Sequence, residues 1–164
     1  MTVRGALLGL FLALTEAACG KPAPKAADVA QGKAFLIKNS AAPGVVTTPS
    51  GLQYRVVHSG PADGLRPKLA DEVKVNYEGK LLDGEVFDSS FDRGAPAVMQ
   101  VREVIPGWQE ALQLMRPGDE WLIYVPAALA YGDRAAGPIP PGSVLMFRLE
   151  LLGVAPDASS VGKG

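Results

Sequence analysis

Apolar and polar residues alternate along several short segments of the chain. The alternation runs through residues 52–56 and 73–78, and it recurs at 144–152, where the odd-numbered positions from 145 to 151 are apolar. A period of two residues places every second side chain on the same face of an extended strand. These segments, together with the apolar run 121–125, predict antiparallel strands that each bury one face.

A tight turn and two helices are predicted around these strands. Asp83-Gly84 separates residues 80–82 from 85–87, and glycine accepts the positive φ of short hairpin turns, so Phe87 belongs to a returning strand. A first helix is expected at about 29–39, and a second at 106–116. The second helix has an apolar stripe with the spacing i, i+3, i+4 and i+7, formed by Trp108, Ala111, Leu112 and Met115.

The order of these elements indicates an α+β fold. Strands dominate, strand–helix–strand alternation is missing from the pattern, and residues 127–142 read as a loop that contains Tyr131-Gly132 and a proline-rich run. The amphipathic helix needs a sheet to cover its apolar stripe. We therefore expect an antiparallel β-sheet wrapped around one short amphipathic α-helix, with a short N-terminal helix.

The first residues have the order of a secretory signal: Arg4, an apolar stretch at 6–14, and the small residues Ala17 and Ala18. The rest of the 164 residues leaves room for one hydrophobic core. We expect a signal peptide at 1–18, a linker and short helix at 19–43, one globular domain at 44–153 and a flexible tail at 154–164.

Charge and composition exclude several classes of function. With 16 basic and 17 acidic residues the formal net charge is -1, and no basic run offers a surface for nucleic acid. Cys19 is the one cysteine, so no intramolecular disulfide can form. His58 has no second histidine or nearby cysteine with which to share a metal, and we expect it at the surface.

Asp88 and Asp92 flank Ser89-Ser90-Phe91 and form the candidate carboxylate pair for acid–base chemistry or for a cation. Asp and Ser after a strand also fix turns by bonding to nearby backbone N–H groups, which is the simpler interpretation of Asp92. Asp88 directly follows Phe87 and fits the simple interpretation less well. Motifs of phosphate loops, serine hydrolases and zinc peptidases are absent from the sequence.

Six short motifs follow one another between residues 75 and 151. They are Val75-Asn76-Tyr77-Glu78-Gly79, Gly84-Glu85-Val86-Phe87-Asp88-Ser89-Ser90, Val104-Ile105-Pro106-Gly107-Trp108, Ala130-Tyr131-Gly132, Ile139-Pro140-Pro141 and Leu145-Met146-Phe147-Arg148-Leu149-Glu150-Leu151. In this order they resemble the motifs of the FKBP family of peptidyl-prolyl cis-trans isomerases, over residues 50–153. The stretch 32–54 is similar to the exported bacterial branch that includes the macrophage infectivity potentiators.

The resemblance implies a ligand pocket with Trp108 as its floor. Asp88 and the Tyr131 hydroxyl would be its polar points, Arg93 would pair with Asp88 or Tyr77, and the Ile105 backbone N–H would hold a substrate carbonyl. The walls would come from apolar and aromatic side chains, namely Tyr77, Phe87, Val104, Ile105, Ile139 and Phe147. From the residues alone, Phe87 and Phe147 are equally well explained as core aromatics.

Several features of the sequence bear on how such a pocket would work. Trp108 follows Gly107, whose missing side chain leaves space for a ligand to approach. Ala97 and Met99 stand where the family often has phenylalanines that line the pocket, and the loop 131–139 lacks a histidine found in the human cytosolic member. These departures leave ligand specificity and drug affinity open.

The resemblance implies an isomerase that acts on X-Pro bonds of unfolded or nascent exported proteins and is inhibited by rapamycin and tacrolimus. Rotation about an amide breaks no bond, so the reaction needs no nucleophile, metal or cofactor. Two alternatives stay open. The same cleft would serve a chaperone or proline-peptide binding module with little turnover, and the chain would also suit a small structural lipoprotein without an active cleft.

Residues 14–20 resemble a bacterial lipoprotein signal, in which Cys19 becomes the lipidated first residue of the mature chain. This implies a protein exported to the periplasm and anchored to the membrane. Glu16 occupies a place normally taken by an apolar residue. Ordinary cleavage, which would give a soluble periplasmic protein, is therefore the alternative.

Overall fold

A computed structural model describes residues 26–158 as one antiparallel sheet with a helix across one face and a second helix beside it. The helices are α1 (Ala26–Ser40) and α2 (Pro106–Leu114), with short 3-10 turns at Val101–Glu103 and Ala127–Leu129. The strands are β1 (Val45–Thr47), β2 (Gln53–His58), β3 (Glu72–Lys80), β4 (Val86–Ser89), β5 (Ala97–Gln100), β6 (Glu120–Val125) and β7 (Leu145–Ala155). The expected α+β architecture is confirmed.

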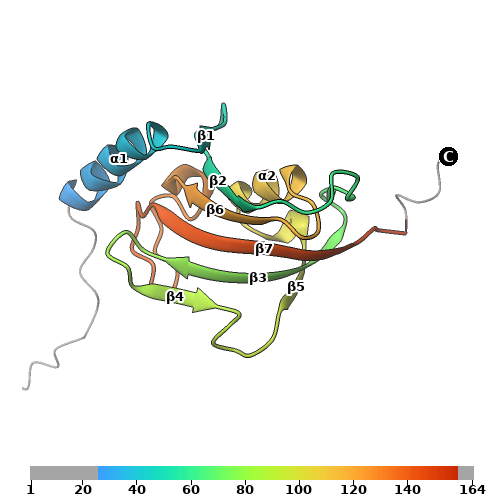
Figure 1. Cartoon of the computed structure of the whole chain (residues 1–164). Helices are drawn as coiled ribbons and strands as arrows, with labels where there is room; N and C mark the ends of the chain where they lie inside the picture. Colours follow the sequence, from blue (N-terminus) through green and yellow to red (C-terminus); the bar gives the residue numbers. More distant parts are fainter. Residues whose placement is uncertain (1–25, 159–164) are drawn as a thin grey trace, which may run out of the picture.

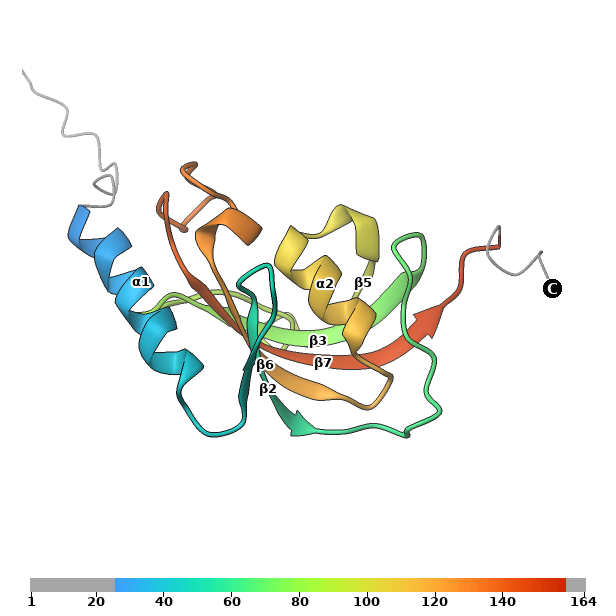
Figure 2. The same cartoon turned by 90° about the horizontal axis from the view of Figure 1, so that it is seen from above.

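The sheet has the strand order β1-β2-β6-β7-β3-β4, and β5 also pairs with β3. Every pairing is antiparallel, and the longest one joins β3 to β7 at the centre of the sheet. Figure 2 shows α2 lying across one face of the sheet, with α1 to one side near the loop between β6 and β7. The sheet curves around α2, which accounts for the buried stripe of that helix.

The core lies between α2 and the inner face of the sheet. In β7, Leu145, Phe147, Leu149 and Leu151 are all buried, as the alternation predicts. The apolar stripe of α2 is buried as well, with Ala111, Leu112 and Met115 fully covered. Together these residues form one hydrophobic cluster.

Several element boundaries differ from those predicted. β1 and β5 are short and were not expected, and α2 ends at Leu114 although the stripe continues to the buried Met115. Val56 in β2 is 43% exposed, so the expected buried face of this strand is wrong beyond its first residues. The strand lies near the sheet edge, and β1 pairs with it only as far as Arg55.

The ends of the chain are described only in part. β7 continues to Ala155, two residues into the segment expected as a tail. The expected signal peptide, Cys19 and the last residues of the expected tail lie outside the described residues. Within 26–158, no helix combines the length and apolar character needed to cross a bilayer.

Candidate active site

A cavity of about 320 Å³ opens beside the first turn of α2. We call it the Trp108 pocket. Side chains reach it from β3, β4, β5 and β7, from the segment before α2, and from the loop after β6. The lining residues are Tyr77, Phe87, Asp88, Met99, Glu103, Val104, Ile105, Trp108, Tyr131 and Phe147.

The aromatic rings of the Trp108 pocket meet edge to face. Trp108 makes T-shaped contacts with Tyr77, at a centroid distance of 5.0 Å, and with Phe147, at 5.2 Å. Phe87 meets Phe147 in the same way, at 5.5 Å and 90°. This geometry is favourable for aromatic quadrupoles. Neither neighbouring ring lies parallel to the indole. Trp108 is only 4% exposed, yet it lines the cavity.

The helix start positions Trp108 and the segment before it. Pro106 occupies the first turn of α2, where its missing N–H is not needed for the helix. Gln109 in the same turn donates its side-chain N–H groups to the Val104 carbonyl, at 2.8 Å, and to the Arg102 carbonyl, at 3.2 Å. The helix therefore fixes the segment that leads into Ile105.

Two glycines make room for this packing. A Cβ at Gly79 of β3 would lie 2.6 Å from Phe87 Cζ and 2.8 Å from Phe147 Cε1, so both rings rest against bare backbone. At Gly107 a Cβ would lie 2.5 Å from Val125 Cγ1. The expectation that Gly107 leaves space for a ligand is therefore wrong, because its open side is occupied by β6.

Three polar groups meet at the edge of the Trp108 pocket. The Tyr77 hydroxyl donates to Asp88 Oδ2 at 2.5 Å, and Arg93 Nη2 donates to the Tyr77 oxygen at 2.8 Å. Arg93 also forms an ion pair with Asp88. The Arg93 guanidinium lies 5.3 Å from the Tyr77 ring centroid, which adds a cation–π contact.

These contacts shift the pKa values of both acids. Partial burial alone would raise the pKa of Asp88, but hydrogen bonds from Tyr77 and Arg93 outweigh burial and hold this pKa below its ordinary value. Burial, followed by the hydrogen bond to Asp88, raises the pKa of Tyr77. At neutral pH the edge therefore carries an ionised carboxylate, a neutral phenol and a guanidinium.

Ser90 holds this edge in register. Its hydroxyl accepts the Tyr77 N–H at 2.9 Å, and its own N–H donates to the Tyr77 carbonyl at 2.9 Å. Ser90 is fully buried. Asp92 is exposed and does not line the pocket, and its N–H donates to Ser89 Oγ at 3.2 Å, so the simpler turn interpretation fits better than the candidate carboxylate pair with Asp88. Among residues 26–158, no group of three metal-ligating side chains gathers at any point.

The structure brings together every residue predicted for the site except Ile139. Ile139 is buried like Trp108 and Phe147 and belongs to the same hydrophobic cluster, but it does not line the cavity. Met99 lines the pocket, whereas Ala97 does not. Glu103, which also lines the pocket, was missed, and its place directly before the motif that begins at Val104 was the available signal. His58 is exposed, as expected.

Family comparison gives two matches. Residues 64–152 match the model described as FKBP-type peptidyl-prolyl cis-trans isomerase, and residues 12–56 match the domain amino-terminal to it. The chain is 51% identical over 126 residues to "Outer membrane protein MIP" of Legionella longbeachae. The aligned region covers 76% of this chain and 53% of that protein. The chain spans between 53% and 61% of the first three curated relatives it matches.

Solved structures agree with this assignment. The crystal structure of FkpA from Escherichia coli superposes with a TM-score of 0.76 at 43% identity, over 80% of this chain and 61% of that one. A peptidyl-prolyl cis-trans isomerase from Pseudomonas syringae pv. tomato superposes with a TM-score of 0.75 at 34% identity, over 84% of this chain and 100% of that one.

Proposed function

This chain belongs to the FKBP-type peptidyl-prolyl cis-trans isomerase family, and from this premise we propose that it accelerates rotation about X-Pro bonds in exported proteins. The observation that carries the proposal is the Trp108 pocket itself. It is lined mainly by apolar and aromatic side chains and has one hydrogen-bonded charge pair at its edge. Such a site suits a prolyl ring and requires no covalent chemistry.

The physical basis lies in the amide bond. Resonance imposes a barrier of about 18–20 kcal/mol on rotation, and an unaided X-Pro bond isomerises in about tens to hundreds of seconds. At the twisted halfway point conjugation is lost and the charge separation of the amide falls. An apolar, water-poor cavity therefore favours the twisted state over the planar one.

The required stabilisation is modest. Each 1.36 kcal/mol of differential binding is about a tenfold gain in rate, so about 5–7 kcal/mol shortens minutes to milliseconds. Shape and desolvation around one proline residue supply free energies of this size.

The lining residues suggest separate roles. In this proposal Trp108 is the floor beneath the prolyl ring, and the walls are formed by Tyr77, Phe87, Val104, Ile105 and Phe147. The Ile105 N–H holds the substrate carbonyl. Asp88 and the Tyr131 hydroxyl face the twisting amide as polar groups, and Arg93 keeps Asp88 ionised.

The test is an isomerisation assay on a short Leu-Pro or Phe-Pro peptide, followed by protease coupling or by NMR exchange. We expect rapid exchange that rapamycin or tacrolimus blocks in proportion to occupancy of the Trp108 pocket. Peptide binding without turnover would replace the isomerase with a proline-peptide binding module or chaperone. If the peptide is neither bound nor isomerised, a structural role remains.

The place of action in this proposal is the periplasm, reached through the signal at residues 1–18. The name "Outer membrane protein MIP" of the Legionella relative supports export. Cys19 would carry a lipid that tethers the domain to the membrane. Palmitate labelling of the wild-type chain beside Cys19→Ser tests the tether, and an unlabelled wild-type chain would leave a soluble protein.

A further inference from the structure

Helix α1 is fixed to the sheet by its second half. The buried Gln53 of β2 donates its side-chain N–H to the Leu36 carbonyl at 2.8 Å and accepts from Asn39 Nδ2 at 2.8 Å. The Phe35 ring packs against Tyr124 of β6 at a centroid distance of 5.7 Å. The helix is therefore attached to two neighbouring strands.

The first half of α1 presses on the loop between β6 and β7. A Cβ at the buried Gly32 would lie 2.9 Å from Val144 Cγ2, which is too close for any side chain without movement. A Cβ at Gly142 would lie 3.0 Å from Val29 Cγ2. The helix and the returning arm of the loop thus meet with no room for an added methyl group.

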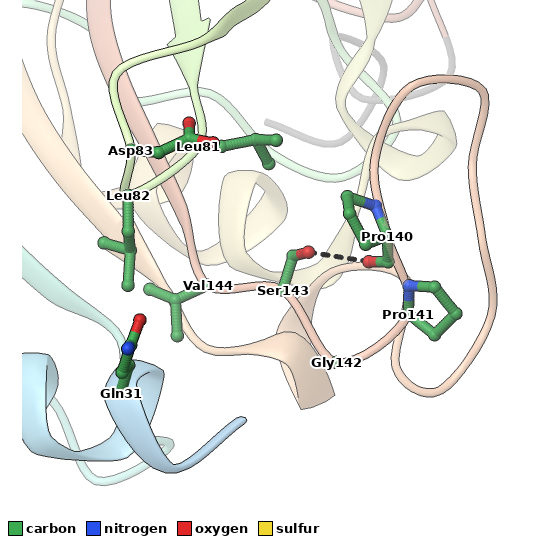
Figure 3. Close-up of a pocket in the computed structure, with 9 residues that line it drawn as sticks. All are labelled: Gln31, Leu81, Leu82, Asp83, Pro140, Pro141, Gly142, Ser143 and Val144. Carbon is green, nitrogen blue, oxygen red and sulfur yellow. Dashed lines mark hydrogen bonds between the residues drawn. The ribbon is translucent and has the colours of Figure 1, made fainter. Parts of the chain in front are cut away.

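This contact has an empty space next to it. A cavity of about 220 Å³, which we call the α1 cavity, separates Gln31 from Leu82 and from the proline-rich part of the loop (Figure 3). Its walls come from α1, from the β3–β4 turn and from residues 140–144. Beside this cavity, α1 meets the loop at Val29 and Gly32, which lie against Gly142 and Val144.

The loop transmits its position to the Trp108 pocket. The Gly142 N–H donates to the Gly132 carbonyl at 2.7 Å, which closes the base of the loop. Ala136 and Ile139 pair in both directions within it. Gly132 directly follows Tyr131, which lines the Trp108 pocket. A shift of Gly142 relative to α1 therefore moves Tyr131.

We propose that α1 is a positioning element of the Trp108 pocket. Through Val29 and Gly32 it holds the loop between β6 and β7, and this fixes the position of Tyr131 relative to the bound proline peptide. The inference rests on the proposed isomerase function for its consequence in turnover. In this proposal Gly32 makes no contact with substrate and acts only by holding the loop.

Gly32→Ala tests the proposal. Alanine is the better helix former, so the substitution favours α1 itself while forcing its Cβ against Val144. We expect KM for a Leu-Pro peptide to rise about three- to tenfold with kcat changed less than about twofold, since lost positioning at Tyr131 weakens substrate binding. Lys33→Ala, one residue along at an exposed position, is the matched control and should leave KM unchanged.

A second substitution distinguishes positioning from general damage. Val144→Ala removes the Cγ2 atom that an alanine at residue 32 would meet. The double variant Gly32→Ala/Val144→Ala should therefore recover a KM within about twofold of the wild-type value. A double variant as impaired as Gly32→Ala alone would overturn the proposed contact.

A readout without turnover separates this inference from the proposed function. Amide hydrogen exchange at Gly142 reports on its bond to Gly132, and Gly32→Leu should accelerate that exchange while Lys33→Ala does not. A wild-type chain without isomerase activity would reject the proposed function and leave this exchange test valid. Unchanged KM and unchanged Gly142 exchange in folded Gly32→Leu would reject the positioning role.

Discussion

Two tryptophans, Trp108 of α2 and Trp121 of β6, belong to the same hydrophobic cluster, and they differ in what covers them. Trp108 is 4% exposed and Trp121 is 5% exposed, and both indole N–H groups are buried without a hydrogen-bond partner in the described chain. Tyr54 stacks on Trp121 at a centroid distance of 4.2 Å and a tilt of 13°. The rings beside Trp108 stand edge to face instead.

The difference shows that burial alone does not distinguish a binding floor from a core residue. A parallel ring uses the whole face of Trp121 for packing, so that region contributes stability. Edge-to-face neighbours hold Trp108 firmly and leave a cavity beside it. Substitutions in the two regions should therefore separate activity from stability.

The largest effect should come from replacing each of the two tryptophans, in separate variants, with leucine. Trp108→Leu removes the floor of the Trp108 pocket, and we expect kcat/KM for a Leu-Pro peptide to fall about 100-fold. Trp121→Leu should leave kcat/KM within about twofold but reduce the free energy of unfolding by about 2–3 kcal/mol, from the cavity left beneath Tyr54. Equal losses of activity in the two variants would remove the distinction.

A smaller contrast is expected between Asp88 and Asp119. Asp88→Asn removes the charge at the pocket edge, and we expect kcat/KM to fall about tenfold with little change in unfolding. Asp119 is buried and accepts the N–H groups of Gly60, at 2.6 Å, and Arg116, at 2.9 Å. Asp119→Ala should cost about 2–3 kcal/mol of stability and no activity, because these donors lose their partner.

A substitution at Met99 should increase the drug affinity of the Trp108 pocket. Met99→Phe places an aromatic ring where the pocket has a flexible thioether, and we expect rapamycin to bind about three- to fivefold more tightly. Calorimetry measures this directly. Val98→Phe, at an exposed neighbouring position of β5, is the control and should bind the drug as the wild-type chain does.

The smallest effect should be that of pH. The pKa of Asp88 is lowered and that of Tyr77 is raised, so neither group changes charge between about pH 5 and 8, and kcat/KM should vary less than about twofold there. A lowered carboxyl pKa stabilises the fold above the unfolded value of about 3.9, and this contribution is lost as pH falls through the folded pKa. A titration of kcat/KM with a midpoint near pH 6 would contradict the assignment.

Periodicity predicted the central strands and α2 because each buries one continuous face. It failed where no such face exists. β5 has only four residues at the sheet edge, and β2 turns outward after its start, so neither shows a reliable alternation.

The site could be predicted as far as its motifs reach. Tyr77 and Asp88 lie in these motifs, and the family resemblance already implied Arg93 as their partner, so the hydrogen bonds among the three groups were predictable. The backbone pairing of Ile139 with Ala136 closes the loop on itself, and no pattern in the sequence predicts that pairing. The contact of Gly32 with Val144 joins residues more than a hundred positions apart and has no local signal.

The bare backbone at Gly79 sets a limit on how this enzyme family member can diversify. Because Phe87 and Phe147 both rest on it, any larger residue there would displace two walls at once, although Gly79 itself does not line the Trp108 pocket. A mutant library that aims at new specificities should keep this codon fixed and vary Met99 and Glu103 instead. Substitutions at Met99 and Glu103 can change the pocket only while Gly79 keeps the two phenylalanine rings in position.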